Sequence, residues 1–432
     1  MKKSSKTRQN PALQTGSDHN LRRAVITGIS AITPVGHSVS ETWEALKAGI
    51  SGAARITVLD ASPYPCQIGC ELKDFHPEQY IPRKKIRHMA ISSQLAVIAA
   101  GQAIDDAGLD LETMDRDRIG VIIGTAGGST VGEVEQATHQ LLSERSRKLS
   151  PFQILRFWPN MPAFFIAERY NFRGYNNTIV TACASGSQAI GDAARMIQYG
   201  KAEVILAGGT EHLVSETTLA GFTAMRALST SWNNEPEKAM RPFDANRDGF
   251  IPAAGSAVLI IEDFEHARAR DAHIYAEVLG SGVSNDAYNM IIPDPEGDGA
   301  ALAIHRALED ANVAIDEIDY INAHGTSTPL GDLSETKAIK SVFGNRAYDI
   351  PISSTKSMIG HLMGASGAVE AVVCIMTMIE GIIHPTINLD TPDPDCDLDY
   401  VPNEALEMKV NVVLSNSFGL GGQNACLILG RL

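Results

Sequence analysis

The chain has 432 residues, of which 44% are hydrophobic and 20% charged, proportions that are ordinary for a globular protein. A formal net charge of −15 argues against nonspecific binding of nucleic acid and against attraction to anionic membrane surfaces. The six cysteines form no paired Cys-x-x-Cys pattern and no signal peptide precedes them, which predicts free thiols in the cytoplasm and no metal site.

The first third of the chain begins with a polar stretch and then alternates buried strands with helices. Residues 1–22 lack an apolar run and are predicted to be a disordered tail, with a transit peptide as the alternative. Residues 24–29 and 119–124 read as buried strands, and residues 40–48 as a helix with a serine cap.

One dense basic cluster, residues 81–88, stands out in this acidic chain. It contains Arg83, Lys84 and Arg87 and leads into a predicted helix over residues 90–106. Such a cluster is either the solvated start of a helix or a docking surface for an acidic partner.

The stretch around Cys183 is the first candidate for chemistry. A β-branched strand over residues 178–181 runs into the cysteine, and a small-residue helix over 184–198 follows it. A thiol at a helix N-terminus meets free amide N–H groups and the positive end of the helix dipole, which favour the thiolate. The alternative is that Cys183 is a small apolar core residue.

Two histidines in the second half strengthen the case for a nucleophile. His324 follows a strand near 319–323, and His361 lies in a glycine- and serine-rich block that also contains Lys356. Another strand then runs into the glycine turn near Leu420, which can aim backbone N–H groups at an oxyanion.

Buried strands and helices alternate through the rest of the chain, which predicts α/β layers. The apolar run 368–383 contains two glutamates and is too short to span a bilayer, so we expect a core helix. The other predicted elements are strands at 204–209, 258–261, 275–279, 320–323, 410–414 and 425–429, and helices at 263–270, 299–311 and 334–343.

Four ordered motifs resemble the β-ketoacyl-acyl-carrier-protein synthases, the elongating condensing enzymes, and are most similar to synthase II and to polyketide ketosynthases. They are TACASGS, NAHGTSTPLGD, KSMIGHLMGASGAVE and NSFGLGGQNA, within a similarity that runs from Arg23 to the C-terminus. The resemblance implies a duplicated, five-layer αβαβα thiolase-like fold. Its N-terminal half (23–272) would carry the cysteine and its C-terminal half (273–432) the histidines, with the catalytic crevice between them.

The same resemblance assigns roles to the site. Cys183 would accept an acyl group, with its oxyanion between the amides of Cys183 and Leu420. His324 and His361 would donate from Nε2 to the malonyl thioester oxygen during decarboxylation, and Lys356 would hold charge and position around His324 and Glu370. The resemblance requires no metal or organic cofactor.

It also implies substrate-binding and partner surfaces. Thr326 and Thr328 match positions that bind the pantetheine arm, and further substrate-binding residues are Ala126, Phe222, Phe418 and Leu420; Glu370 and Asp332 give structural support. The partner would be an acyl carrier protein, in its acyl and malonyl forms, docked on Arg83, Lys84, Arg87 and Arg226. A homodimer is expected, and a heterodimer is the alternative.

Some positions depart from the family pattern. Leu420 stands where a gating phenylalanine is usual, and Asn289 and Ile291 replace common hydroxyl or histidine residues. These changes favour a specialised pathway over housekeeping fatty-acid elongation. A non-condensing chain-length subunit is the alternative function, which the presence of Cys183 disfavours, and degradative thiolase chemistry lacks its second cysteine. We therefore predict a synthase that condenses an acyl thioester with malonyl-carrier protein in fatty-acid or polyketide biosynthesis.

Overall fold

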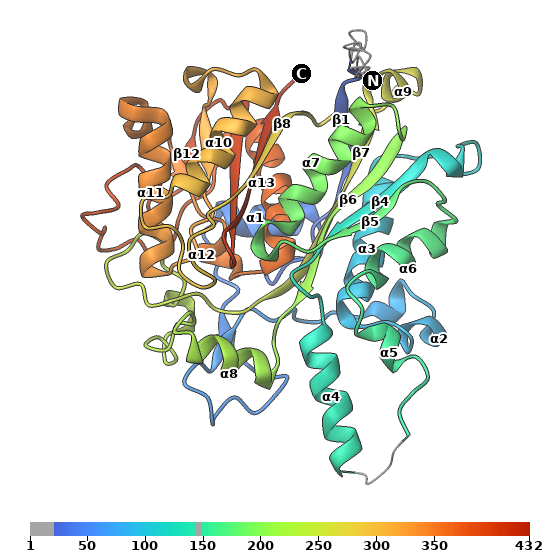
Figure 1. Cartoon of the computed structure of the whole chain (residues 1–432), viewed down its shortest axis with the longest axis horizontal. Helices are drawn as coiled ribbons and strands as arrows, with labels where there is room; N and C mark the ends of the chain where they lie inside the picture. The colour runs from blue at the N-terminus through green and yellow to red at the C-terminus, as the bar shows by residue number, and fades with distance from the viewer. Residues whose placement is uncertain (1–20, 144–147) are drawn as a thin grey trace, which may run out of the picture.

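A computed structural model describes residues 21–143 and 148–432 (Figure 1). The predicted tail lies outside these residues, except for Leu21 and Arg22. The Arg22 N–H donates to the carbonyl of Gln198 at 3.1 Å, so the chain is already attached to the fold there.

Ten strands form one mixed sheet in the order β10-β9-β13-β14-β8-β1-β7-β6-β4-β5. Each half repeats the same topology. If the five strands of a half are numbered in chain order, their order from the outer edge of the sheet to its centre is 3-2-4-5-1 in both halves. In sheet order the strands are Ile352–Ser353, Tyr320–Asn322, Val412–Gly419, Gln423–Gly430, Ala276–Asn285, Ala24–Ile29, Ala254–Asp263, Val204–His212, Ile119–Gly124 and Asn176–Ile179. This repeat is the duplicated α/β fold that the resemblance implies.

The two halves meet where β1 pairs with β8, and two small sheets lie apart from the main one. The β1–β8 contact is brief, with Val25 opposite Glu277 and Ile26 opposite Ala276. Two further sheets of two strands each pair β2 (Ala54–Arg55) with β3 (Ile68–Gly69) and β11 (Ile382–Ile383) with β12 (Leu406–Glu407).

Helices pack against the outside of each half of the sheet and also between the two halves. α7 and α13 contact strands of both halves, whereas α3 and α6 cover the N-terminal half and α10 and α11 the C-terminal half (Figure 1). The helices α1 to α13 are Val39–Lys47, Arg83–Ile86, Ile91–Asp106, Thr130–Ser143, Gln153–Arg156, Met161–Tyr170, Ser185–Gln198, Glu216–Ala224, Phe264–Ala269, Asp298–Ala311, Pro329–Phe343, Lys356–Ile359 and Ser366–Glu380.

The central helices α7 and α13 pack closely because small residues line their contact. A Cβ on Gly186 would lie 2.8 Å from the backbone nitrogen of Ala368, so only glycine fits there. Within the described residues, one helical stretch, Met363–Glu380, is long and apolar enough to cross a membrane, but 83% of it is buried inside the protein. It is the core helix that the sequence predicts, and it ends where Gly381 turns left-handed.

Most predicted elements appear with shifted ends. The strand predicted at 178–181 is β5 and stops at Ile179, and the helix predicted from residue 40 begins at Val39 because Ser38 is its cap, accepting from the Glu41 N–H. Helices α4, α6 and α8 were not predicted.

Candidate active site

Cys183 lies on a sharp turn between β5 and α7. Ala182 adopts a left-handed backbone (φ 49°), which swings the cysteine into a 3₁₀ turn, Ala182–Ala184, immediately before the helix. The Ser185 hydroxyl accepts from the Thr181 N–H at 2.9 Å and lies 2.7 Å from the Ala182 carbonyl, which fixes the turn. The Cys183 side chain is buried.

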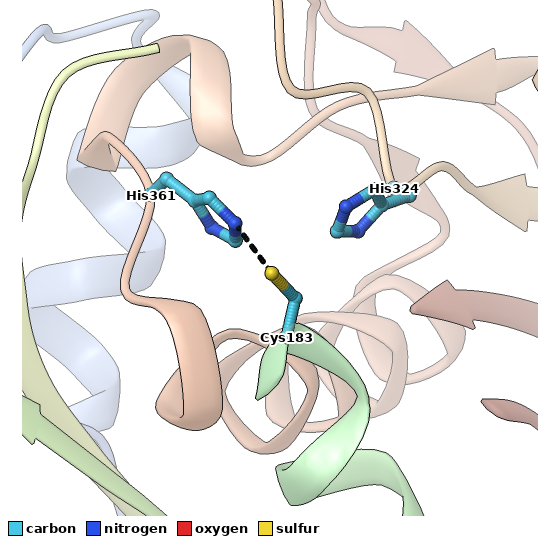
Figure 2. A group of neighbouring side chains, drawn as sticks. All are labelled: Cys183, His324 and His361. Atoms are coloured by element: carbon cyan, nitrogen blue, oxygen red, sulfur yellow. Dashed lines mark hydrogen bonds between the residues drawn. The ribbon is translucent and has the colours of Figure 1, made fainter. Parts of the chain in front are cut away.

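Three segments distant in sequence bring Cys183, His324 and His361 together (Figure 2). The Cys183 Sγ lies 3.1 Å from His361 Nε2, and one side-chain atom from each of the three residues lies within 4.8 Å of the others. His324 follows β9, and His361 lies between α12 and α13. This spacing could also suit a metal ion, but the positive charge of buried Lys356 acts on both imidazoles and opposes a cation there.

The hydrogen bonds of His361 determine where its proton sits. The Met363 N–H donates to Nδ1 at 3.3 Å, and the Ser366 hydroxyl lies 3.1 Å from the same atom. A backbone N–H can only donate, so Nδ1 accepts and the proton is on Nε2, facing Cys183. Burial lowers the pKa of His361 well below its usual value, so the ring is a neutral donor.

His324 is held through its backbone. Its N–H donates to Glu335 Oε1 at 2.8 Å, and the Gly325 N–H donates to Glu335 Oε2 at 2.7 Å. Burial, followed by the charge of Lys356, lowers the pKa of His324 well below its usual value. Its Nδ1 is buried and has no hydrogen-bond partner within the described residues.

Lys356 lies between His324 and Glu370. Its Nζ donates to the His324 carbonyl at 2.6 Å and to Glu370 Oε1 at 2.5 Å. Both side chains of this ion pair are fully buried. Burial raises the pKa of Glu370 while the lysine charge opposes that rise. Lys356 therefore acts on the position and charge of His324 rather than touching its ring.

Burial dominates the ionisation of the cysteine. It raises the pKa of the Cys183 thiol to about 11, although hydrogen bonding from the Leu420 N–H, the charge of Lys356 and the cysteine's own N–H lower it. The N–H groups at the helix terminus therefore favour the thiolate, as expected, but burial outweighs them. The two amides named as oxyanion donors, those of Cys183 and Leu420, both point at the sulfur.

A cavity of about 230 Å³ opens onto the two histidines and the cysteine. Its walls include Thr326, Thr328, Phe418 and Leu420 from the predicted substrate-binding set, together with Arg226, Asn289 and Ile291. Ala126 and Phe222 do not line it: Phe222 stands behind Phe250, with ring centroids 5.4 Å apart.

The supporting carboxylate Asp332 is buried beneath the threonines. It accepts from the Phe243 N–H at 2.8 Å and the Ser327 N–H at 3.1 Å, and it pairs with Arg247 at 3.4 Å. Thr328 caps α11 by accepting from the Gly331 N–H, so the two predicted threonines stand at the start of that helix.

The predicted docking residues fall into two separate groups. Arg83, Lys84 and Arg87 are exposed on or beside α2, whereas Arg226 is exposed just after α8 and lines the cavity. In Figure 1, α2 lies at the right of the molecule and α8 at the lower left, with α4 between them, so one chain does not bring these groups into one patch.

Sequence reasoning missed three residues near the site. Glu335 holds the His324 turn, Glu211 bonds the Gly364 N–H, and Met363 Sδ lies 3.4 Å from the Cys183 sulfur. Two of these residues have a signal in the sequence. Glu211 is a charged residue within the apolar run of β6, and Glu335 lies three residues after Asp332, on the same face of a helix.

Comparisons with known proteins agree with this geometry. Residues 21–267 match the family model of the β-ketoacyl synthase N-terminal domain, and residues 275–390 match that of its C-terminal domain. The 3-oxoacyl-[acyl-carrier-protein] synthase 2 of Coxiella burnetii is 47% identical over 411 residues, covering 95% of this chain and 99% of the relative. The Staphylococcus aureus synthase 2 is 44% identical, covering 95% and 98%.

Solved structures give the same result. A β-ketoacyl synthase from Burkholderia phymatum is 38% identical with a TM-score of 0.88, covering 95% of this chain and 100% of that one. The ishigamide ketosynthase/chain length factor is 36% identical with a TM-score of 0.89 and the same coverage. With its cysteine and two histidines gathered at one cavity, this chain belongs to the β-ketoacyl synthase family.

Proposed function

We propose that this protein is a 3-oxoacyl-[acyl-carrier-protein] synthase that elongates an acyl chain by decarboxylative condensation. The observation that carries the proposal is the buried triangle of Cys183, His324 and His361 at the cavity. Relatives named synthase 2, at 44% and 47% identity over almost their whole length, support fatty-acid biosynthesis as the pathway.

The first half-reaction transfers the acyl group to the enzyme. The Cys183 sulfur attacks the acyl thioester carbonyl, and its proton goes to the leaving carrier thiol as the carbon–sulfur bond to the carrier breaks. The negative oxygen that forms lies between the amides of Cys183 and Leu420, which already point at the sulfur. Burial raises the pKa of Cys183 to about 11 even with these N–H groups present, so the sulfur keeps its proton until the attack.

The second half-reaction forms the new carbon–carbon bond. The malonyl group loses carbon dioxide, and the electron pair of the broken bond moves to the thioester oxygen as an enolate. His324 and His361, held neutral by burial, stabilise that oxygen as N–H donors. The enolate carbon then attacks the acyl carbon and releases Cys183, while Thr326 and Thr328 bind the pantetheine arm.

The partner is an acyl carrier protein, with Arg226 at the cavity mouth and the α2 cluster as docking groups. Support comes from a related structure, 33% identical with a TM-score of 0.87, which is described as a type II polyketide acyl carrier protein in complex with its ketosynthase. We place the reaction in the cytoplasm, consistent with six free, buried cysteines.

A second copy of this chain is the proposed oligomeric partner. β5 is an edge strand, and the adjoining Tyr175 and Val180 are 41% and 50% exposed. α4 also exposes Val131, Val134 and Leu142. A heterodimer with a chain-length subunit, as in the ishigamide ketosynthase/chain length factor, is the alternative that analytical ultracentrifugation of the purified chain would separate.

Intact-mass spectrometry tests the function directly. We expect the wild type to gain one acyl mass from acyl-carrier protein and to lose it as a β-ketoacyl product once malonyl-carrier protein is added. Cys183→Ala should gain no acyl mass, because the nucleophile is gone. If the wild type is never acylated by any chain length, with or without a partner subunit, the proposed activity is wrong. The preferred length distinguishes fatty-acid from polyketide substrates.

A further inference from the structure

Glu211, in β6, is a buried carboxylate that the chemistry above does not use. Its side chain is fully buried, and within the described residues no basic side chain pairs with it. It accepts instead from the Ala126 N–H at 2.6 Å, the Gly364 N–H at 3.1 Å and the Thr125 hydroxyl at 3.4 Å. Burying a carboxylate on neutral donors alone is costly, so its presence calls for a specific explanation.

The carboxylate sits where two turns touch. One turn, residues 125–128, follows β4, and the other is the 3₁₀ turn Met363–Ala365. A Cβ on Gly364 would lie 2.3 Å from the Ala126 nitrogen, so the two backbones meet with no side chain between them. One oxygen, Glu211 Oε2, accepts from both turns and joins them.

Each turn is attached to one member of the reactive pair. On one side, Gly364 follows Met363, whose N–H bonds His361 Nδ1. On the other side, the Thr125 carbonyl lies 3.1 Å from the Ser185 hydroxyl, which also fixes the turn that carries Cys183. One path from the sulfur to the imidazole through the protein therefore passes through the Glu211 carboxylate, beside the direct contact of Met363 Sδ with the Cys183 sulfur.

We propose that Glu211 is a positioning residue that holds His361 Nε2 against the Cys183 sulfur by clamping these two turns together. The clamp sets the rate at which Cys183 reacts. The choice of acyl donor in the test rests on the proposed function, but the clamp itself does not.

Substitutions at Glu211 distinguish a role for its hydrogen-bond acceptor, which the clamp needs, from a role for its negative charge. Glu211→Gln keeps one oxygen that can accept from both N–H groups, and its amide can donate to the Thr125 hydroxyl. Glu211→Met has a similar length but no acceptor, and Glu211→Ala serves if the methionine variant does not fold. The control is Glu262→Gln, a buried carboxylate paired with Arg270 near the opposite end of the β6–β7 pair.

Two rates are measured for each variant: alkylation of Cys183 by iodoacetamide and acylation by acyl-carrier protein, both by intact mass. We expect Glu211→Met to slow both at least about tenfold, because small misplacements of reacting groups are costly. The apparent KM for carrier protein should not change, and Glu211→Gln should stay within about threefold of wild type. Thermal unfolding of every variant accompanies the rates.

Three results would overturn the proposal. They are wild-type rates in folded Glu211→Met, equal slowing in the glutamine and methionine variants, and equal slowing in Glu262→Gln at a matched loss of thermal stability. If wild type is alkylated but accepts no acyl group, the proposed function fails, and the alkylation rates still decide whether the clamp exists.

Discussion

At the scale of single residues, the site depends on a buried ion pair that touches no reacting atom. Lys356 neutralises Glu370 and bonds the His324 carbonyl, and it lies close enough to depress the pKa of both histidines. A donor histidine must stay neutral to keep its Nδ1 and Nε2 in fixed roles, so this positive charge helps to keep both rings unprotonated.

Removing the lysine charge tests this arrangement. Lys356→Met leaves Glu370 buried without a partner, and we expect a loss of about 3–5 kcal/mol in the free energy of unfolding, measured with urea. Adding Glu370→Gln should recover part of that loss, because the uncompensated charge disappears. As a control, Lys337→Met breaks the more exposed pair with Glu296 and should cost no more than about 1 kcal/mol. Equal losses in the two single variants would contradict the expectation.

Residues that hold the backbone of the site were harder to predict than residues that carry its chemistry. Cys183, His324, His361 and Lys356 stand in motifs whose composition is unusual, so they could be named from the chain. Glu335 acts through backbone N–H groups formed only when α11 packs against the loop after β9. A contact of that kind has no pattern along the sequence. The raised pKa of Cys183 has the same origin, because burial is a property of the folded chain.

At the scale of elements, buried strands were predicted well and surface helices poorly. β1 and β4 have the predicted ends, since a β-branched run bounded by glycine or polar residues has few alternatives. α4 exposes most of its side chains and has only two buried residues, Glu133 and Ala137. A helix with so small a buried face has a weak apolar period, and its neighbours decide whether it forms.

Because α2 and Arg226 lie apart, the contribution of each to carrier-protein docking can be tested separately. Reversing charge with Arg83→Glu and Lys84→Glu should raise the KM for carrier protein roughly tenfold and weaken its salt dependence, since rim charges act on association. Turnover of a carrier-free acyl-pantetheine should not change. Arg226→Glu should affect both substrates, because Arg226 also lines the cavity. Arg268→Glu on α9 is the control. If the α2 variant keeps the wild-type KM, this helix is only a solvated surface.

At the scale of the whole molecule, duplication explains why the site lies where it does. Each half contributes the same strand order, and the ends of equivalent strands approach from opposite halves. Cys183 follows β5 and His361 follows β10 by way of α12, and these are the third strands of the two halves, so neither half could make the site alone. The close contact between α7 and α13 holds the two halves together, and Glu211 and Glu335 are buried around the site.

These buried acids predict how stability varies with pH. Burial raises the pKa of Glu211 to about 8 and that of Glu335 to about 7, so the folded protein retains protons that the unfolded chain has already released. Unfolding then releases protons, and the free energy of unfolding falls as pH rises toward 8. The histidines with lowered pKa, His324 and His361, act in the opposite sense, but only below about pH 6.5, where the unfolded chain binds protons.

The window from pH 6.5 to 8 therefore separates the acids from these two histidines, while His266, whose pKa is raised by its hydrogen bond with Glu262, also releases its proton there. We expect the wild type to lose stability there by up to about 1.4 kcal/mol per pH unit for each proton released, measured by urea unfolding. Glu211→Gln keeps the clamp but cannot titrate, so its stability should fall less steeply over the same window. The cysteines are common to both proteins and cancel in the comparison. Identical slopes would mean that Glu211 is ionised in the folded protein throughout this range, and that the hydrogen bonds it accepts outweigh its burial.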